Sequence, residues 1–410
     1  MSIDDVLRET RRLFDEYLEA VAVEAPQMRA ARSKSFRLGE ASRRAWILRG
    51  LIRALDWWPS RKPPRYVFQG LRHRHLIQLL PPREVMVLGE RGEFFACLRM
   101  GCRFSWIGFV AKAFDLFYWG GDAAALRMAV SSIQRRMATP RQRPEYLFLY
   151  EDTLPTGLVL ALALSRVPGL AVACIQHGYY GPERLKRRNE GSICRFNLLI
   201  DREQGRFIKG LDAPGSFVLG LPYEVAAPPR FVRRVILVGA GGRGSDVARY
   251  LLSLSHFVRI YRHLSDAGIA VSYRPHPDED REFVASLFPH TCLEDKWTLL
   301  RESRAVFVGF NSTLLFEALS FGNGVIGLDT SEFAGDRAFA PDRTVAPSDY
   351  ARIDEYVKEL FEIASERRVP PTPPASDRFR RCIEQIDRAL AGDGGGESRS
   401  GSRFAGNMLP

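Results

Sequence analysis

Four short segments combine residue types that can contact a phosphate or move a proton. One is "RPHP", in which Arg274 and His276 stand beside prolines directly after a strand-like run. Proline fixes φ and lacks an N–H, so this segment is predicted to be a stiff loop that cannot continue a sheet. A histidine held there can donate to a phosphate oxygen or act as an acid. A lone histidine is more often structural, and that alternative stays open.

A glycine-rich segment, "GAGGRGS", follows the strand-like run "RVILV". The backbone amides of Gly241 and Gly242 can approach an anion closely, and Arg243 can add a charge-assisted contact. The segment lacks the GK[ST] ending of a P-loop and the spacing of the dinucleotide fingerprint. A plain turn between strand and helix is therefore the alternative.

The third segment is "FNSTLLFEALSFGNGVIGL", which begins after another strand-like run. Asn311 or Ser312 can cap a helix that begins at Thr313, and its free amides and hydroxyls suit a phosphate. Glu317, about one turn further on, is predicted to accept hydrogen bonds from ribose hydroxyls. Capping and core packing are the alternative explanation.

The fourth segment, "CIQHGYYGP", places His177 at the end of a strand in the first half of the chain. A histidine has a suitable pKa to act as general base on an acceptor hydroxyl. A histidine bonded within its own loop is the alternative. The other residues predicted on this acceptor side are Glu151, Asp152, Gln176, Gly178, Tyr179 and Tyr180.

The elements that must position these segments form two α/β series. Short continuous apolar runs alternate with helical patterns from residue 84 onward, which indicates parallel sheets covered on both faces. A linker is predicted from Glu224, and ligands of open α/β sheets bind at the carboxyl ends of the strands. The predicted parts are a helical, basic extension (1–80), an N-terminal Rossmann-like acceptor domain (81–225), a C-terminal Rossmann-like nucleotide-sugar domain (226–370), a C-terminal helix (371–390) and a disordered tail (391–410).

The charge of the chain is uneven. Its 410 residues carry a formal net charge of +11, and Arg29 to Arg74 hold 13 Lys or Arg against two acids. Residues 43–65 are predicted to contain a basic amphipathic helix that Pro59 ends, which indicates attachment of this segment to an anionic membrane surface or, alternatively, a helix packed on the domain.

Six cysteines without a CxxC pair, no signal peptide and no apolar run of about 18 residues favour a cytoplasmic protein, peripheral on the membrane at most.

Together these segments resemble the GT-B glycosyltransferases that build bacterial surface polysaccharides such as capsule and lipopolysaccharide. More narrowly they resemble enzymes with cytidine-nucleotide donors: sialyl- and polysialyltransferases, Kdo transferases and CDP-glycerol polyol-phosphate polymerases. His276–Pro277 matches their His-Pro motif, Ser312–Thr313 their hydroxyl motif and His177–Gly178 the turn that supplies the base. The resemblance covers roughly residues 84–330. Sialyltransferases carry an acid at the base position, and "EALSFGNGVIGL" also resembles sugar-nucleotide epimerases, so the transferred group and a UDP donor stay open.

The resemblance implies a GT-B-like fold and an inverting, metal-independent glycosyltransferase without a cofactor. It implies that His177 is the base, and that His276, Ser312, Thr313 and the amides of Gly241–Arg243 stabilise the leaving phosphate. The expected partners are a nucleotide-sugar and a glycan or lipid-linked glycan acceptor, with no nucleic acid. The alternatives are a sugar-nucleotide 2-epimerase, a polyol-phosphate transferase and a non-catalytic basic protein that binds membrane or nucleic acid.

Overall fold

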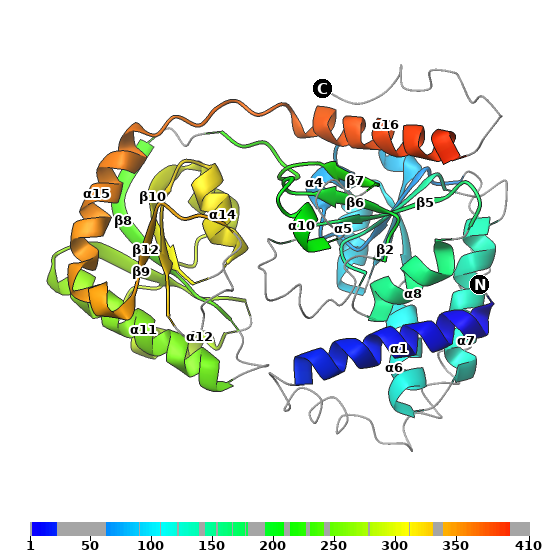
Figure 1. Ribbon diagram of the computed structural model, residues 1–410, viewed down its shortest axis with the longest axis horizontal. Helices are drawn as coiled ribbons and strands as arrows, with labels where there is room; N and C mark the ends of the chain where they lie inside the picture. The colour runs from blue at the N-terminus through cyan, green and yellow to red at the C-terminus, as the bar shows by residue number, and fades with distance from the viewer. Residues whose placement is uncertain are drawn as a thin grey trace.

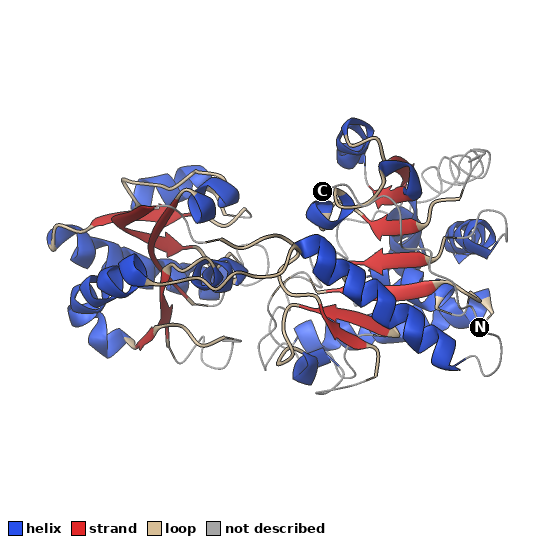
Figure 2. Ribbon diagram, turned by 90° about the horizontal axis from the view of Figure 1, so that it is seen from above, coloured by secondary structure: helices blue, strands red, loops and turns tan. Residues whose placement is uncertain are grey.

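The protein forms two α/β domains, each built on a parallel sheet, as the computed structural model shows in Figures 1 and 2. The structure describes residues 2–22, 63–89, 91–106, 108–120, 123–138, 144–152, 155–165, 167–176, 178, 193–208, 214–226, 230–241, 247–277, 279–310, 312–330 and 339–393.

The N-terminal sheet has, among the described residues, seven strands in the order β3-β2-β1-β4-β5-β6-β7. Their four central members are buried along their whole length, which explains why they read as unbroken apolar runs. The strands are β1 (Tyr66–Gln69), β2 (Val85–Gly89), β3 (Arg103–Trp106), β4 (Tyr146–Leu149), β5 (Ala171–Ile175), β6 (Phe196–Leu199) and β7 (Ser216–Val218).

Helices cover both faces of this sheet. One face packs against α1 (Ile3–Ala22), α6 (Gly108–Gly120), α7 (Ala123–Ala138) and α8 (Pro155–Leu164). The other face lies against α4 (Arg74–Ile77), α5 (Phe94–Arg99) and the last helix, α16 (Ala375–Asp393), which crosses back from the C-terminal domain (Figure 1). The short helix α10 (Gly205–Ile208) follows β6.

The C-terminal sheet has, in the described part of the chain, five strands in the order β12-β11-β10-β8-β9. These are β8 (Arg230–Val238), β9 (Ala270–Arg274), β10 (Ser303–Gly309), β11 (Gly324–Leu328) and β12 (Arg343–Val345). The helices around them are α11 (Val247–Asp266), α12 (Arg281–Leu287), α13 (Lys296–Arg301), α14 (Thr313–Ser320) and α15 (Ile353–Glu366).

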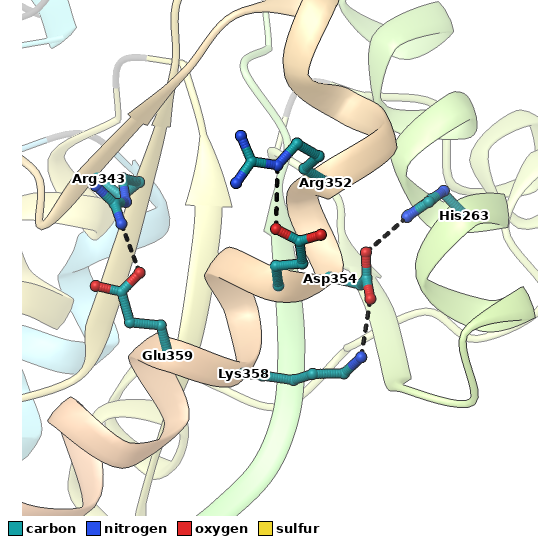
Figure 3. Close-up of polar contacts among 7 residues, drawn as sticks. His263, Arg343, Arg352, Asp354, Lys358 and Glu359 are labelled. Atoms are coloured by element: carbon teal, nitrogen blue, oxygen red, sulfur yellow. Dashed lines mark hydrogen bonds and ion pairs between the residues drawn. The ribbon is translucent and has the colours of Figure 1, made fainter.

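Helices α11 and α15 are joined at their exposed edges by charged side chains. Asp354 of α15 accepts from His263 of α11 at 3.1 Å and from Lys358 at 2.8 Å (Figure 3). These two contacts lower the pKa of Asp354 to about 2. The carboxylate therefore stays ionised and links the two helices throughout the neutral range.

The element boundaries differ from the sequence-based ones in three places. Strand β1 lies inside the segment 1–80 that was predicted to be a helical extension, and α1 packs on α7 and α8 as part of the domain. The run "FSWIGFV" is a strand only to Trp106, because α6 begins at Gly108. Strand β8 begins at Arg230, within the predicted linker.

The basic segment 43–65 lies almost entirely outside the described residues. The predicted tail 391–410 begins too early, because residues 391–393 form the end of α16, and its remainder lies outside the described residues. In the part of the chain that the structure describes, no helix combines the length and the apolar character that crossing a membrane requires.

Candidate functional site

The candidate site is a cavity of about 830 Å³ between the two domains, which is the size of a typical small-molecule site. Helix α14 lies on the side of the C-terminal domain that faces the N-terminal domain (Figure 1), and its first turn lines the cavity. The polar and aromatic lining residues are Arg72, His73, Arg74, His75, Gln78, Arg99, Gln176, Tyr223, Lys296, Trp297, Thr313 and Glu317.

The charge of this cleft is strongly positive. Arg72, Arg74 and Arg99 line the N-terminal wall and Lys296 the C-terminal wall, whereas Glu317 is the one acid among the described lining residues. Within the described part of the chain, none of the three arginines is paired with a carboxylate. Such a cleft attracts and holds anionic groups, phosphates among them.

Glu317 does not project freely into the cleft as the ribose contact predicted from the sequence. Its side chain is 6% exposed, and its Oε1 accepts from Lys296 Nζ at 2.8 Å and from the Tyr223 hydroxyl. Burial and the neighbouring carboxylate raise the pKa of Tyr223, so the phenol remains a donor. Glu317 therefore ties α14 to α13 and to the interdomain linker, and any contact with ribose is left to its Oε2.

Three rings from three parts of the chain meet beside this carboxylate. The His75 ring of α4 lies 4.7 Å from Trp297 of α13 and 5.8 Å from Tyr223 of the linker. Burial, reinforced by the cations Arg74, Arg301 and Lys296, lowers the pKa of His75 to about 4. His75 is therefore neutral at pH 7, and packs as an aromatic ring between the domains.

The hydroxyl motif lies at the cleft. Ser312 caps α14, its Oγ accepting from the Leu314 amide at 3.3 Å, and Thr313 lines the cavity. A Cβ placed on Gly178 would lie 3.3 Å from Thr313 Oγ1. The turn after β5 and the start of α14 are therefore close neighbours, which brings the predicted acceptor and donor motifs near each other. Asn311 lies outside the described residues.

The turn after β5 is held by Gln176, predicted from the sequence as an acceptor contact. Its Nε2 donates to the Gly178 carbonyl at 2.8 Å and to Gln204 Oε1, while its Oε1 accepts from the Ile200 amide at 2.9 Å. These bonds make Gln176 a buried brace for the turn. His177, Tyr179 and Tyr180 lie outside the described residues.

The "RPHP" loop and the glycine loop share one buried acid that the sequence analysis did not single out. Glu279 accepts from the amide of His276 at 2.9 Å, from the amide of Gly241 at 3.4 Å and from the Tyr273 hydroxyl. The Gly241 amide assigned to a phosphate is thus bonded to a carboxylate. An acid three residues after His276 was the available signal, since it can accept from that backbone. Gly242 and Arg243 lie outside the described residues.

The remaining predicted residues lie away from the cavity. His276 is exposed and is not among the lining residues, and Arg274 donates to the Glu294 carbonyl. Glu151 and Asp152, which follow β4 inside the N-terminal domain, are 3% and 1% exposed. Glu151 accepts from Gln69 at 3.3 Å and Asp152 from the Cys194 amide at 3.0 Å. Neither carboxylate lines the cleft.

Comparison with solved structures decides the fold. A putative UDP-N-acetylglucosamine 2-epimerase from Listeria monocytogenes matches with a TM-score of 0.50 and 13% identity, over 79% of this chain and 96% of that one. The chain has the GT-B fold. At this identity the match shows the fold alone.

Two further structures are similar at lower scores. UDP-GlcNAc 2-epimerase from Neisseria meningitidis bound to UDP-GlcNAc has a TM-score of 0.48 and 12% identity, over 78% of this chain and 99% of that one. CalG4, the calicheamicin glycosyltransferase, has a TM-score of 0.43 and 12% identity, over 82% and 97%. No protein-family model and no curated protein sequence matches the chain.

Proposed function

We propose that the chain is a glycosyltransferase that moves a sugar from a nucleotide-activated donor to a glycan acceptor. The observation that carries the proposal is the basic cleft between two parallel sheets, which Thr313 lines and beside which the turn at Gly178 lies close to Thr313. Ligands of such sheets bind at the carboxyl ends of the strands, where these segments lie. Four lining cations match the negative charge of a nucleotide-sugar.

The proposed reaction is an inverting displacement. The acceptor oxygen forms a bond to the anomeric carbon, while the bond from that carbon to the donor phosphate breaks and the phosphate keeps the electron pair. His177 removes the acceptor proton, and Ser312 and Thr313 are assigned to the leaving phosphate. The assignment of His276 to the same phosphate requires that its loop reach the cleft, because the exposed ring lies outside the cavity. Removing one preorganised donor of this kind typically costs about 10²–10³ in rate.

The charge on the leaving phosphate would be offset by the cations of the cleft, foremost Arg72, Arg74 and Arg99, because Lys296 is already paired with Glu317. A metal ion is therefore not required by the proposal, and we expect transfer to continue in excess EDTA. Loss of activity on chelation, restored by Mg²⁺ or Mn²⁺, would contradict this part.

Thermal-shift measurements with CMP, CDP, UDP and GDP test donor binding. A ligand that binds only the folded state at 100-fold above its Kd stabilises it by about 2.7 kcal/mol. The resemblance favours a cytidine nucleotide, and stabilisation by UDP alone would replace that expectation. No stabilisation by any of the four would contradict a nucleotide site.

Variants of the two histidines separate their roles. His276→Ala is expected to weaken nucleotide binding, and His177→Ala to preserve binding while abolishing turnover. His290→Ala removes an exposed histidine of the C-terminal domain, which also holds His276, and serves as the control. Normal transfer by both variants would show that the site assignment is wrong.

A sugar-nucleotide 2-epimerase is the second candidate, because the Listeria protein of the same fold carries that description. An epimerase needs no acceptor. Conversion of a UDP-sugar by the protein alone would decide for it. Exchange of the C2 proton in deuterated water measures this conversion. Polyol-phosphate transfer is recognised instead by phosphorus retained in the product.

The proposal places the enzyme in cell-surface polysaccharide synthesis, peripheral on the cytoplasmic face of the membrane. The basic segment 43–65 is the support for this, because Lys and Arg near the surface are attracted to anionic lipids. We expect the protein to co-sediment with vesicles that contain phosphatidylglycerol. Exchanging the arginines of this segment for glutamine should abolish the co-sedimentation. Binding to neutral vesicles alone would contradict it.

A further inference from the structure

A second cavity lies on the N-terminal domain, apart from the interdomain cleft. It has a volume of about 450 Å³ and is bounded by the edge strand β7, the segment after β6 and the start of α16. No residue lines both this cavity and the cleft. Its occupant would therefore be distinct from the substrates of the cleft.

The charged side chains that line this cavity are all cationic. They are Arg202, Arg378 and Arg381, and no acid is among the described lining residues. Arg381 is exposed and, within the described part of the chain, has no recorded ion pair. Its neighbour Arg380 is instead paired with Asp377 at 2.8 Å. The charge of Arg381 is thus left without a paired carboxylate in the described part of the chain.

Arg378 is half-buried, its hydrogen bonds go to neutral groups, and the Glu224 carboxylate acts on it only through its charge. It donates to the carbonyls of Leu219 at 3.2 Å and Tyr223 at 2.9 Å, and its Nε is buried without a hydrogen-bond partner among the described residues. Burial lowers the pKa of Arg378, which means that the surroundings disfavour its charge. A negative group in the cavity would relieve that cost.

Strand β7 contributes a buried hydroxyl and apolar side chains to the lining of this cavity. Ser216 Oγ is buried without a hydrogen-bond partner in the described part of the chain, and it lies beside Phe217 and Val218 of β7. We propose that this cavity is a second binding site, which takes an oxyanion, phosphate or carboxylate, carried by a sugar or similarly compact body. The guanidinium groups would hold the anion and the β7 wall would contact the body of the ligand.

The site lies where the chain passes between the domains. Arg378 holds the outgoing segment through Leu219 and Tyr223, and Pro373 of the returning segment lines the cavity. An occupant would lie against Arg378, which holds the outgoing segment, and against Pro373 of the returning segment, apart from the residues that line the cleft.

Calorimetric titration of the full-length chain with inorganic phosphate and, separately, glucuronate tests the site and distinguishes the two sources of negative charge. Arg381→Ala and Arg202→Ala are expected to weaken binding of the accepted anion about tenfold or more, since a hydrogen bond to a charged group contributes that much. Arg380→Ala, one residue away and paired with Asp377, should bind as the wild type does.

Three results would overturn the proposal. The first is no binding of either anion by the wild type at millimolar concentration. The second is unchanged binding in both arginine variants. The third is binding that Arg99→Ala abolishes and Arg381→Ala does not, because the anion would then lie in the cleft. Nucleotide binding by Arg381→Ala reports on the cleft separately, so failure of the transferase proposal leaves this test intact.

Discussion

At the scale of single residues, buried acids organise the loops that the sequence marked for chemistry. Glu279 joins the glycine loop to the "RPHP" loop, and Glu317 joins α14 to the linker through Tyr223. A buried carboxylate is costly unless several donors satisfy it, and both acids have such donors. Because donors within the protein already satisfy these two carboxylates, the charge that a ligand meets in the cleft comes mainly from the lining cations.

His75 provides a pH-dependent prediction. Its pKa is lowered from 6.5 to about 4 on folding, so between these values the unfolded chain binds a proton that the folded chain does not. The stability that neutral His75 contributes is complete above pH 6.5 and is lost as the pH falls toward 4. We expect the melting temperature of wild type to fall more between pH 7 and pH 5 than that of His75→Phe.

Differential scanning calorimetry at the two pH values measures this, with His290→Phe, a change at an exposed histidine, as the control. Equal falls in melting temperature for wild type and His75→Phe would contradict the prediction. Solvent reaches the half-exposed ring, so the difference should be modest.

At the scale of elements, what the sequence could predict follows from how local each signal is. Strands β4, β5 and β10 are buried apolar runs that the sequence predicts directly. Once a strand is predicted, the loop that follows it is located as well. Strand β1 was missed because "YVFQ" is short and follows a basic segment. The cleft residues of α4, α5 and α13 were missed because only tertiary packing brings Arg74, Arg99 and Lys296 to one cavity.

The first turn of α14 has two separable roles. Ser312→Ala removes the N-cap and should cost about 1 kcal/mol of stability. Ser312→Asp retains a capping oxygen but adds negative charge beside the proposed phosphate site. We expect Ser312→Asp to unfold in urea like wild type and to bind nucleotide more weakly, as measured by calorimetry. Wild-type nucleotide affinity in this variant would place the phosphate elsewhere.

The contact between Gly178 and Thr313 can be probed by one methyl group. A Cβ at residue 178 would lie 3.3 Å from Thr313 Oγ1, so the hydroxyl must shift by a few tenths of an ångström. We expect Gly178→Ala to lower the rate of transfer while the protein stays folded, because positioning errors of this kind weaken catalysis. Gly92→Ala, where no atom lies within 4 Å, is the control. Full activity of Gly178→Ala would show that the close approach of Gly178 to Thr313 is not needed for transfer.

At the scale of the whole molecule, α16 makes the N-terminal domain depend on the end of the chain. The last helix buries Phe379, Cys382, Ile383 and Ile386 against a sheet formed from residues 66–218. The sequence predicted the helix but not where it packs, because its amphipathic pattern gives a buried face without naming the partner. The helix also carries Arg378, which holds the linker.

This arrangement predicts that damage to α16 destabilises the opposite end of the sequence. Phe379 is fully buried, with its ring 5.3 Å from that of Phe148 in β4, and Phe379→Ala should cost about 3–5 kcal/mol. The loss should appear in the N-terminal domain, as faster hydrogen exchange in β1, β4 and β5 than in β8 and β10. Phe283→Ala, at a ring that is 41% exposed, should change neither set. Faster exchange confined to α16 would contradict this prediction. It would show that the N-terminal sheet keeps its stability when α16 opens locally, so the helix would not be part of the core of that domain.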